Sequence, residues 1–398
     1  MIITSIKVDN FKSLLNLDVS KLENVNLIYG YNNSGKSNLL KFLEIVFKKK
    51  TFESISTSTI SVGNVIRRRE VIEETDFYRG EIYNYPFYYF KNEWNVSGAM
   101  VTFEIGLSMT KEELKRQPYL LDNALYKEKD IVPAILKGRF IPKDYDAFEI
   151  ELNEVSLDSN IIYSFSAGAT RFFPTLKQGV DSELSRFLQQ FNDAVLLIDS
   201  DRYFQDETFD YSVITDLNSK NLKQWYYYQS IDYTQQDQIK VIEKFVNGFS
   251  ISDPEEDNPN FANLPFKGEI TIKKLADNIE VFLKNGNLNL PVKNFGTGVQ
   301  QIFYILTKIC ACNAKIILIE EFELNLSKRY QVEFLKYLKT YLDKKGKQLI
   351  FTTHSPYIAE ERGIIDSHFE VAISKDGITS ITHQQRGESG YKDWIINH

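Results

Sequence analysis

A glycine loop that ends in a lysine and a serine is the part of this chain best suited to chemistry. It runs from Gly30 to Ser37 in the pattern G-x-x-x-x-G-K-[ST], directly after the apolar run 25–29 and directly before the apolar helical pattern of 38–47. Strand, glycine loop and helix in this order let backbone N–H groups and the positive end of the helix converge on one phosphate group. The sequence therefore predicts a nucleotide-phosphate site in which Lys36 contacts the β and γ phosphates and Ser37 ligates Mg²⁺.

The groups expected to surround the nucleotide belong to this loop and to the first turn of the helix after it. They are Gly30, Asn32, Asn33, Ser34, Gly35, Lys36, Ser37 and Asn38. A strand–turn–helix junction that contains two glycines by chance is the alternative, but it does not explain the lysine–serine pair on the first helical turn. We therefore expect ATP and Mg²⁺ as the ligands.

Two adjacent carboxylates follow a second apolar strand. Residues 316–319 are all Ile or Leu, and Glu320 and Glu321 come directly after them, at the edge where ligands bind in α/β sheets. Glu320 is predicted to hold Mg²⁺ through its water shell, and Glu321 to orient and deprotonate the attacking water. Two solvated loop acids are the alternative. The phosphate loop upstream favours the site, because phosphoryl transfer needs little more than a lysine, a metal and a base.

A histidine and a second glycine loop complete the set of candidate residues. His354 follows the next apolar strand, 348–352, at a position from which an imidazole can donate to a γ-phosphate. Gly296, Thr297 and Gly298 open a predicted helix, so their backbone can also approach a phosphate closely. Because one nucleotide does not need two such loops, we expect the second loop to serve a nucleotide bound by another copy of the chain.

Together these segments resemble the ABC-type ATPase heads of the RecF, SMC and OLD-family proteins, and most closely the OLD-like group. The resemblance rests on NFKS (10–13), GYNNSGKSN (30–38), NFGTGVQQ (294–301), IILIEEFELNLS (316–327) and FTTHSP (351–356). The motifs occupy the first ~50 and the last ~110 residues, and their order and combination are specific even where each motif alone is not. The middle of the chain matches no motif of the group.

The resemblance implies an α/β fold, namely an ABC-type P-loop ATPase head with a β-rich N-terminal lobe and a helical insertion. Such heads dimerise head to tail around two ATP molecules. The resemblance also implies that Glu321 is the catalytic base, that His354 senses the γ-phosphate, and that the loop 296–298 acts in trans. It places Lys12 and Ser13 in the wall of the nucleotide pocket.

Three positions depart from the usual pattern of the group. Glu320 replaces the commoner Asp, which lengthens the side chain by one methylene. Phe322 and Ser327 stand where a proline and a histidine are usual, on either side of Asn325, where the D-loop of the group begins. The last two departures concern the geometry of the D-loop rather than the assignment as an ATPase.

Periodicity and turn residues predict the elements that must position these groups. Strands are expected at 2–8, 25–29, 101–106, 194–198, 268–273, 279–283, 288–292, 315–319 and 348–352, and helices at 36–47, 110–116, 181–191, 234–249, 299–311 and 327–342. The first two strands are expected to feed the phosphate loop. We predict an N-terminal ATPase lobe with a β-rich part (1–175), a helical insertion (176–265) that ends in the acidic loop 252–265, and a C-terminal ATPase lobe (266–398).

Three segments of the middle region invite a nucleic-acid interpretation. The segment 81–94 is dense in aromatic residues, which could stack on single-stranded bases, but a sheet face packed into a core is the commoner outcome. The lysines 48–50 suit the negative end of the preceding helix. The polar tract 51–61, followed by the arginines 67–69, suggests a surface excursion.

Composition limits the class of protein. The chain has 398 residues, of which 43% are apolar, enough for one large domain with an insertion, and its net charge of −7 argues against a globally basic nucleic-acid binder. Its two cysteines, Cys310 and Cys312, exclude a disulfide framework and are expected to be free buried thiols rather than a metal pair. No apolar run reaches the ~20 residues of a membrane span, so we expect a cytoplasmic protein without a membrane partner.

The leading functional prediction is an ATPase that acts as an oligomeric sensor or assembly subunit and controls a separately encoded effector. By resemblance, the effector would be a nuclease in a bacterial anti-phage system. The alternative is a RecF-like DNA-binding ATPase in DNA repair, with DNA held by the basic segments 48–50 and 67–69. An internal nuclease centre at Asp199 and Asp201 is disfavoured because no partner Glu precedes it, and the 44 residues after His354 are too few for the Toprim nuclease domain of many OLD-family proteins.

Overall fold

The computed structural model describes residues 1–47, 101–114, 129–144, 147–166, 169–171, 187–202, 222–231, 236–247, 269–275, 278–285, 287–361 and 363–384. Several predicted features lie outside these ranges. They are the lysines 48–50, the polar tract 51–61, the arginines 67–69, the aromatic segment 81–94 and the acidic loop 252–265.

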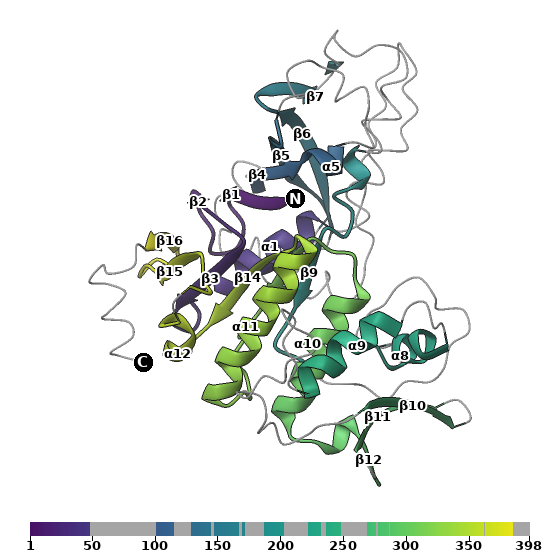
Figure 1. The fold of residues 1–398 in the computed structure, drawn as a ribbon. Helices are drawn as coiled ribbons and strands as arrows, with labels where there is room; N and C mark the ends of the chain where they lie inside the picture. The colour runs from purple at the N-terminus through teal and green to yellow at the C-terminus, as the bar shows by residue number, and fades with distance from the viewer. Residues whose placement is uncertain are drawn as a thin grey trace.

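A six-stranded sheet carries the phosphate loop at its centre (Figure 1). Its order is β16-β15-β3-β14-β13-β9, and every neighbouring pair is parallel except the β15–β16 hairpin at one edge. The strands are β3 (Val25–Gly30), β9 (Val195–Ile198), β13 (Ile316–Ile319), β14 (Gln348–Thr353), β15 (Ser367–Ile373) and β16 (Thr379–Gln384). Because β3, β14, β13 and β9 run in the same direction, their carboxyl ends meet at one edge of the sheet.

Alternation along these apolar strands divides the interior into two cores, one on each face of the sheet. Ile316 and Leu318 of β13 belong to one core, whereas Ile317 and Ile319 belong to the other. Successive side chains of a strand point to opposite faces, so a continuous apolar run is what a strand covered on both faces requires.

Helices cover both faces of the six-stranded sheet. α1 (Lys36–Val46) follows the phosphate loop and packs into the first core. The second core is closed by α8 (Leu222–Ile231), α9 (Gln236–Asn247), α10 (Thr297–Ala311) and α11 (Lys328–Lys345), with the short α12 (Pro356–Ala359) after β14. The helices predicted around 36–47, 234–249, 299–311 and 327–342 are confirmed to within a few residues.

A second, antiparallel sheet packs on the outer side of α1. Its order is β2-β1-β4-β5-β6-β7-β8. The strands are β1 (Ile2–Asp9), β2 (Leu17–Ser20), β4 (Val101–Thr110), β5 (Ile131–Asp144), β6 (Ala147–Leu157), β7 (Asn160–Ser166) and β8 (Ala169–Arg171). Phe42 of α1 contacts Phe103 and Phe140 of this sheet, with ring centroids 5.9 and 6.1 Å apart. The helix that carries Lys36 is therefore clamped between two sheets.

The expectation that the strand at 2–8 feeds the phosphate loop is wrong. β1 pairs with β2 and β4 and lies in the antiparallel sheet, while only β3 leads into the loop. The β-rich part predicted for the N-terminal lobe is present, and it extends through 131–171, where no individual strand was expected. β4 is followed by a short helix, α5 (Lys111–Leu114), whose start is capped reciprocally: Thr110 N–H donates to Glu113 Oε2 at 2.9 Å, and Glu113 N–H donates to Thr110 Oγ1 at 3.4 Å.

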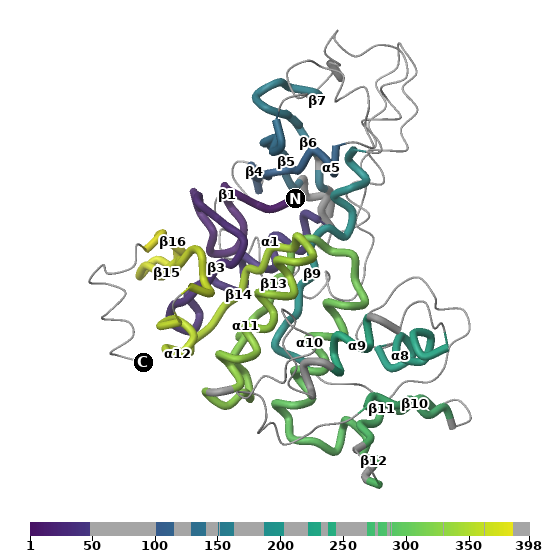
Figure 2. The backbone as a smooth tube through the Cα atoms, in the orientation of Figure 1, coloured from purple at the N-terminus to yellow at the C-terminus, as the bar shows by residue number. Residues whose placement is uncertain are grey.

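A small three-stranded sheet leads into α10. It consists of β10 (Glu269–Leu275), β11 (Asn278–Asn285) and β12 (Leu288–Pro291), all antiparallel, followed by a 3₁₀ turn at Val292–Asn294. The hairpin predicted between 279–283 and 288–292 is confirmed. This sheet and the strands β5 to β7 lie at opposite ends of the molecule (Figure 2). The predicted α/β class is confirmed, and the bounds of the three predicted domains stay predictions.

Candidate nucleotide-binding site

Lys36 is folded back under the phosphate loop. Its side chain is 6% exposed, and Nζ donates to the carbonyls of Gly30 at 2.8 Å and Tyr31 at 2.7 Å. Burial lowers the pKa of Lys36 to about 8, and the carboxylates of Glu321 and, less strongly, of its neighbours oppose this shift. The loop thus holds a cation whose hydrogen-bond partners are backbone carbonyls, a partnership that a phosphate oxygen could replace.

The phosphate loop is supported from behind by a residue of the last described strand. Gly35 has a φ of 100°, and a Cβ on it would lie 2.1 Å from Thr379 Oγ1 and 2.8 Å from Ser13 Oγ. Thr379 Oγ1 donates to the Ser34 carbonyl at 2.8 Å and lies 2.7 Å from Ser13 Oγ, to which Asn38 Nδ2 donates at 2.8 Å. Only a glycine allows this close approach.

Of the two residues expected in the pocket wall, Ser13 lies against the loop. Ser13 is 7% exposed and sits within the cluster behind Gly35, so it supports the loop. Lys12 is also 7% exposed and adopts a left-handed φ of 53°. On the outer side of the loop, Asn32 and Asn33 are exposed, and Asn33 has a φ of 60°.

The predicted metal ligands come together although they are far apart in sequence. Ser37 Oγ donates to a carboxylate oxygen of Glu320, which follows β13. Both groups offer hard oxygen atoms, the ligands that Mg²⁺ prefers, and Mg²⁺ in such sites usually takes its other ligands from phosphate and water. The residues present therefore fit a magnesium ion bound next to a phosphate.

Glu321 is held in an unusual backbone conformation. Its φ is 46°, and its N–H donates to Thr352 Oγ1 at 2.8 Å. Left-handed conformations are uncommon for residues with long side chains, and where they persist the surroundings enforce them. Thr352 belongs to β14, the strand between β13 and the phosphate-loop strand β3.

Glu323 braces the segment that carries His354. Its carboxylate accepts from Thr353 Oγ1 at 2.6 Å and from the His354 N–H at 2.6 Å. The sequence analysis includes Glu323 in a motif but assigns it no role. Its position two residues after Glu321 could have indicated one, because it brings the carboxylate to the end of the neighbouring strand, β14.

In the second glycine loop, 296–298, Gly298 is packed against its own subunit and Gly296 is open to solvent. A Cβ on Gly298 would lie 2.6 Å from the carbonyl oxygen of Asn325, so this glycine is required by a contact within the same subunit. Gly296 and Thr297 are exposed, and a Cβ on Gly296 would meet no atom within 4 Å. The amino end of the 15-residue helix α10 is therefore open to an incoming group.

Comparison with known proteins decides the family. The family model described as AAA ATPase domain (AAA_15) matches residues 1–359. The chain belongs to the AAA ATPase domain family. No curated protein matches this AAA ATPase domain at a significant level.

Solved structures similar to this AAA ATPase domain include three SMC heads. An SMC head bound to the C-terminal winged-helix domain of ScpA is 11% identical (TM-score 0.46; 97% of this chain and 99% of that chain covered). The SMC head domain from Thermotoga maritima is 13% identical (TM-score 0.41; 97% and 100% covered). An SMC head domain bound to the C-terminal domain of ScpA, from Pyrococcus furiosus, is 12% identical (TM-score 0.45; 100% and 99% covered). Likeness at this level carries no information on function.

Arg202, the residue directly after the D-x-D sequence 199–201 that follows β9, belongs to the site. Arg202 is 3% exposed; its Nε donates to the Asp199 carbonyl at 2.7 Å, and its Nη2 donates to the carbonyls of Glu320 and Glu321, the latter at 3.2 Å. Burial raises the pKa of the Asp199 carboxyl. Within the described residues of this AAA ATPase domain, no group of three or more His, Cys, Asp or Glu side chains could hold a metal ion.

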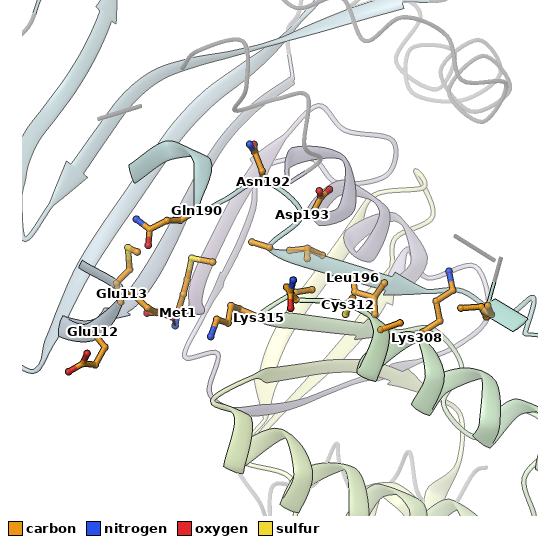
Figure 3. Close-up of a pocket in the computed structure, with 17 residues that line it drawn as sticks. Met1, Glu112, Glu113, Gln190, Asn192, Asp193, Leu196, Lys308, Cys312 and Lys315 are labelled. Atoms are coloured by element: carbon orange, nitrogen blue, oxygen red, sulfur yellow. Dashed lines mark hydrogen bonds and ion pairs between the residues drawn. The ribbon is translucent and has the colours of Figure 1, made fainter. Parts of the chain in front are cut away.

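A cavity of about 680 Å³ lies along β9, away from the phosphate loop (Figure 3). Its wall includes Lys308 of α10, whose pKa is lowered by burial, and the Met1 ammonium, which is paired with Glu113. None of the residues predicted to bind the nucleotide lines it. In the described part of this AAA ATPase domain, no helix is both long and apolar enough to cross a membrane.

Proposed function

We propose that this AAA ATPase domain binds ATP with Mg²⁺ and hydrolyses it to ADP and phosphate. The observation that carries the proposal is the hydrogen bond between Ser37 and Glu320, which joins the end of the phosphate loop to the end of β13. A metal held between a hydroxyl and a carboxylate at that point would lie next to the phosphates cradled by residues 30–37. Lys36, already buried beneath the loop, would then donate to phosphate oxygens instead of backbone carbonyls.

Hydrolysis requires a base on the γ-phosphate side of the site. In our proposal Glu321 accepts a proton from the attacking water, and His354 donates to the γ-phosphate. A Mg²⁺ ion held by Ser37 and Glu320 would neutralise part of the charge on the phosphates. Glu323 acts indirectly, because its carboxylate holds the hydroxyl of Thr353 and the backbone N–H of His354.

The site is completed by a second copy of the chain. Gly296 and Thr297 lie at the open amino end of α10, where backbone N–H groups and the helix dipole favour an anion. One phosphate loop already surrounds the chain's own nucleotide. We therefore infer a head-to-tail homo-oligomer, at least a dimer, in which this end of α10 contacts the neighbour's γ-phosphate.

At the biological level, we propose that the nucleotide state switches the engagement of these heads and thereby controls a separate effector protein. The resemblance to OLD-like ATPases suggests a nuclease effector in anti-phage defence, and the cytoplasmic location expected from the sequence remains part of the proposal. The RecF-like alternative, in which the engaged dimer binds DNA, remains the other outcome of the same test.

The test uses the Glu321→Gln variant, which should bind ATP but fail to hydrolyse it, so that an ATP-bound dimer accumulates. The oligomeric size of the Glu321→Gln variant is measured with and without ATP, and pull-downs with this variant are made with and without DNA. Lys36→Ala is the matched control, because it should not bind ATP and so should not accumulate an ATP-bound dimer. Hydrolysis by Glu321→Gln at the wild-type rate contradicts the assigned base. A salt-sensitive complex with DNA supports the repair alternative, and a protein that stays alone in every nucleotide state argues against an effector.

A further inference from the structure

Arg202 is a buried cation that contacts the backbone of Glu320 and Glu321, the two residues directly after β13. Its Nε is anchored to its own strand end through the Asp199 carbonyl, while Nη2 reaches the carbonyls of Glu320 and Glu321 on the neighbouring strand end. One planar guanidinium therefore ties the carboxyl ends of the adjacent parallel strands β9 and β13 together.

The peptide groups on both sides of Glu321 are pinned. The Glu321 N–H donates to the hydroxyl of Thr352 in β14, and its carbonyl accepts from Arg202, which follows β9. Between these two contacts lies the left-handed φ of 46°. A conformation of this kind survives only where the surrounding structure enforces it.

The arginine is poorly placed for stability alone. Its Nη1 is buried and has no hydrogen-bond partner among the described residues, and an unsatisfied buried donor is unfavourable. Burial also lowers the pKa of the guanidinium. Nearby carboxylates oppose this shift because they favour the charged form; they belong to Asp199, Glu323, Glu320 and Glu321. A neutral or smaller side chain would avoid both costs but would lose the bond to the Glu321 carbonyl.

We propose that Arg202 is a positioning residue for Glu321: together with Thr352 it fixes the left-handed backbone that presents the Glu321 carboxylate to the attacking water. The inference rests on the proposed ATPase function and deepens it. Arg202 acts through the backbone of the base and needs no contact with the nucleotide. Its removal should therefore slow hydrolysis while ATP still binds.

The experiment compares Arg202→Ala, Arg202→Lys and Thr352→Val with the wild type. For Arg202→Ala we expect kcat to fall about 100-fold, the size of a general-base contribution, with the Kd for ATP within about threefold of the wild type. Millimolar guanidinium should restore part of the lost kcat of Arg202→Ala, and Arg202→Lys should lie in between. Thr352→Val keeps the shape of a side chain that is 1% exposed and removes the other contact, so it should also lower kcat.

Amide hydrogen exchange of the peptide 320–326, measured without nucleotide, gives a readout independent of turnover. It should become faster in Arg202→Ala and Thr352→Val. The matched control is Thr307→Val, a fully buried threonine of α10 that bonds to Phe303 and Tyr226 and should change exchange only around itself.

Three results would overturn the inference: a folded Arg202→Ala with wild-type kcat, a loss of ATP affinity as large as the loss of kcat, or unchanged exchange at 320–326. If Arg202→Ala does not fold, Thr352→Val decides by the same measurements. A wild-type protein that neither binds nor hydrolyses ATP would instead overturn the proposed function, and it would do so before any variant is made.

Discussion

At the scale of single residues, the ammonium group of Lys36 is buried even when no phosphate is bound to the loop. Burial lowers its pKa to about 8, and the carbonyls of Gly30 and Tyr31 accept hydrogen bonds from its Nζ. A triphosphate on the loop would favour the charged form and raise this pKa again. ATP binding should therefore be coupled to proton uptake above pH 8.

We accordingly expect ATP affinity to be nearly constant below pH 8 and to fall by up to about tenfold per pH unit above it. Calorimetry in two buffers of different ionisation enthalpy measures both the Kd and the proton uptake. Lys36→Arg is the control, since an arginine stays charged throughout and its weaker binding should not vary with pH. A wild-type affinity that is flat from about pH 7 to 9.5 contradicts a lowered pKa at Lys36.

The adjacent carboxylates Glu320 and Glu321 should be separable by their dependence on metal. Glu320→Gln loses the charged oxygen that accepts from Ser37, so the Mg²⁺ concentration for half-maximal activity should rise more than about tenfold. Glu321→Gln should leave the Mg²⁺ dependence of ATP binding unchanged while kcat falls by about 10²–10⁴. Titrations of Mg²⁺ at fixed ATP measure both effects. The assignment fails if the two variants exchange these behaviours.

Residues that act with their sequence neighbours could be predicted, and residues that act through distant partners could not. Lys36 and Ser37 were found because the whole loop is contiguous. Thr379 was missed because its contact with Ser34 joins residues 345 positions apart, and a threonine after a turn has no distinctive pattern. The role of Arg202 could not be predicted for the same reason, because its contacts with Glu320 and Glu321 join residues 118 and 119 positions apart.

At the scale of elements, the order of strands explains how the separate motifs meet. β3, β14, β13 and β9 are neighbours and parallel, so the phosphate loop, His354, Glu320 and Arg202 all follow the carboxyl ends of adjacent strands. These strands were predictable because each is a short apolar run with polar residues at its end. β1 was assigned to the wrong sheet because its alternating pattern fits any half-buried strand.

The hairpin β15–β16 illustrates how an element without a motif can support the site. Thr379→Val removes the hydroxyl that donates to the Ser34 carbonyl, so we expect unfolding free energy to fall by about 1–3 kcal/mol. The Kd for ATP should rise severalfold as the loop loses its support. Thr382→Val, on the same strand but exposed, is the control and should change neither quantity. Thermal unfolding and nucleotide titration check the prediction, which is wrong if both variants behave alike.

At the scale of the whole molecule, the two glycines of the second loop have different surroundings. Gly298 packs against Asn325 within its own subunit, whereas Gly296 borders open space. A substitution at Gly298 should therefore disturb the fold locally. One at Gly296, whose φ of −59° suits any residue, should leave the subunit intact and affect only what approaches it from outside.

This difference allows a mixing test of the head-to-tail arrangement. Gly296→Asp places a negative charge where a neighbour's phosphate is expected, and Lys36→Ala disables the subunit's own nucleotide site. Each variant alone should be inactive. In a mixture, a dimer of one copy of each contains one undamaged composite site, so activity should recover to about a quarter of the wild-type rate.

The matched control is a mixture of Lys36→Ala with Glu321→Gln. Both of these changes damage the half of the site that the phosphate loop and β13 contribute, so every mixed dimer carries two damaged sites and no recovery is expected. If the first mixture also stays inactive although size measurements show mixed dimers, the open end of α10 does not serve a neighbour's nucleotide. Recovery in the first mixture alone would mean that residues 296–297 and residues 30–37 act on the same ATP from two subunits.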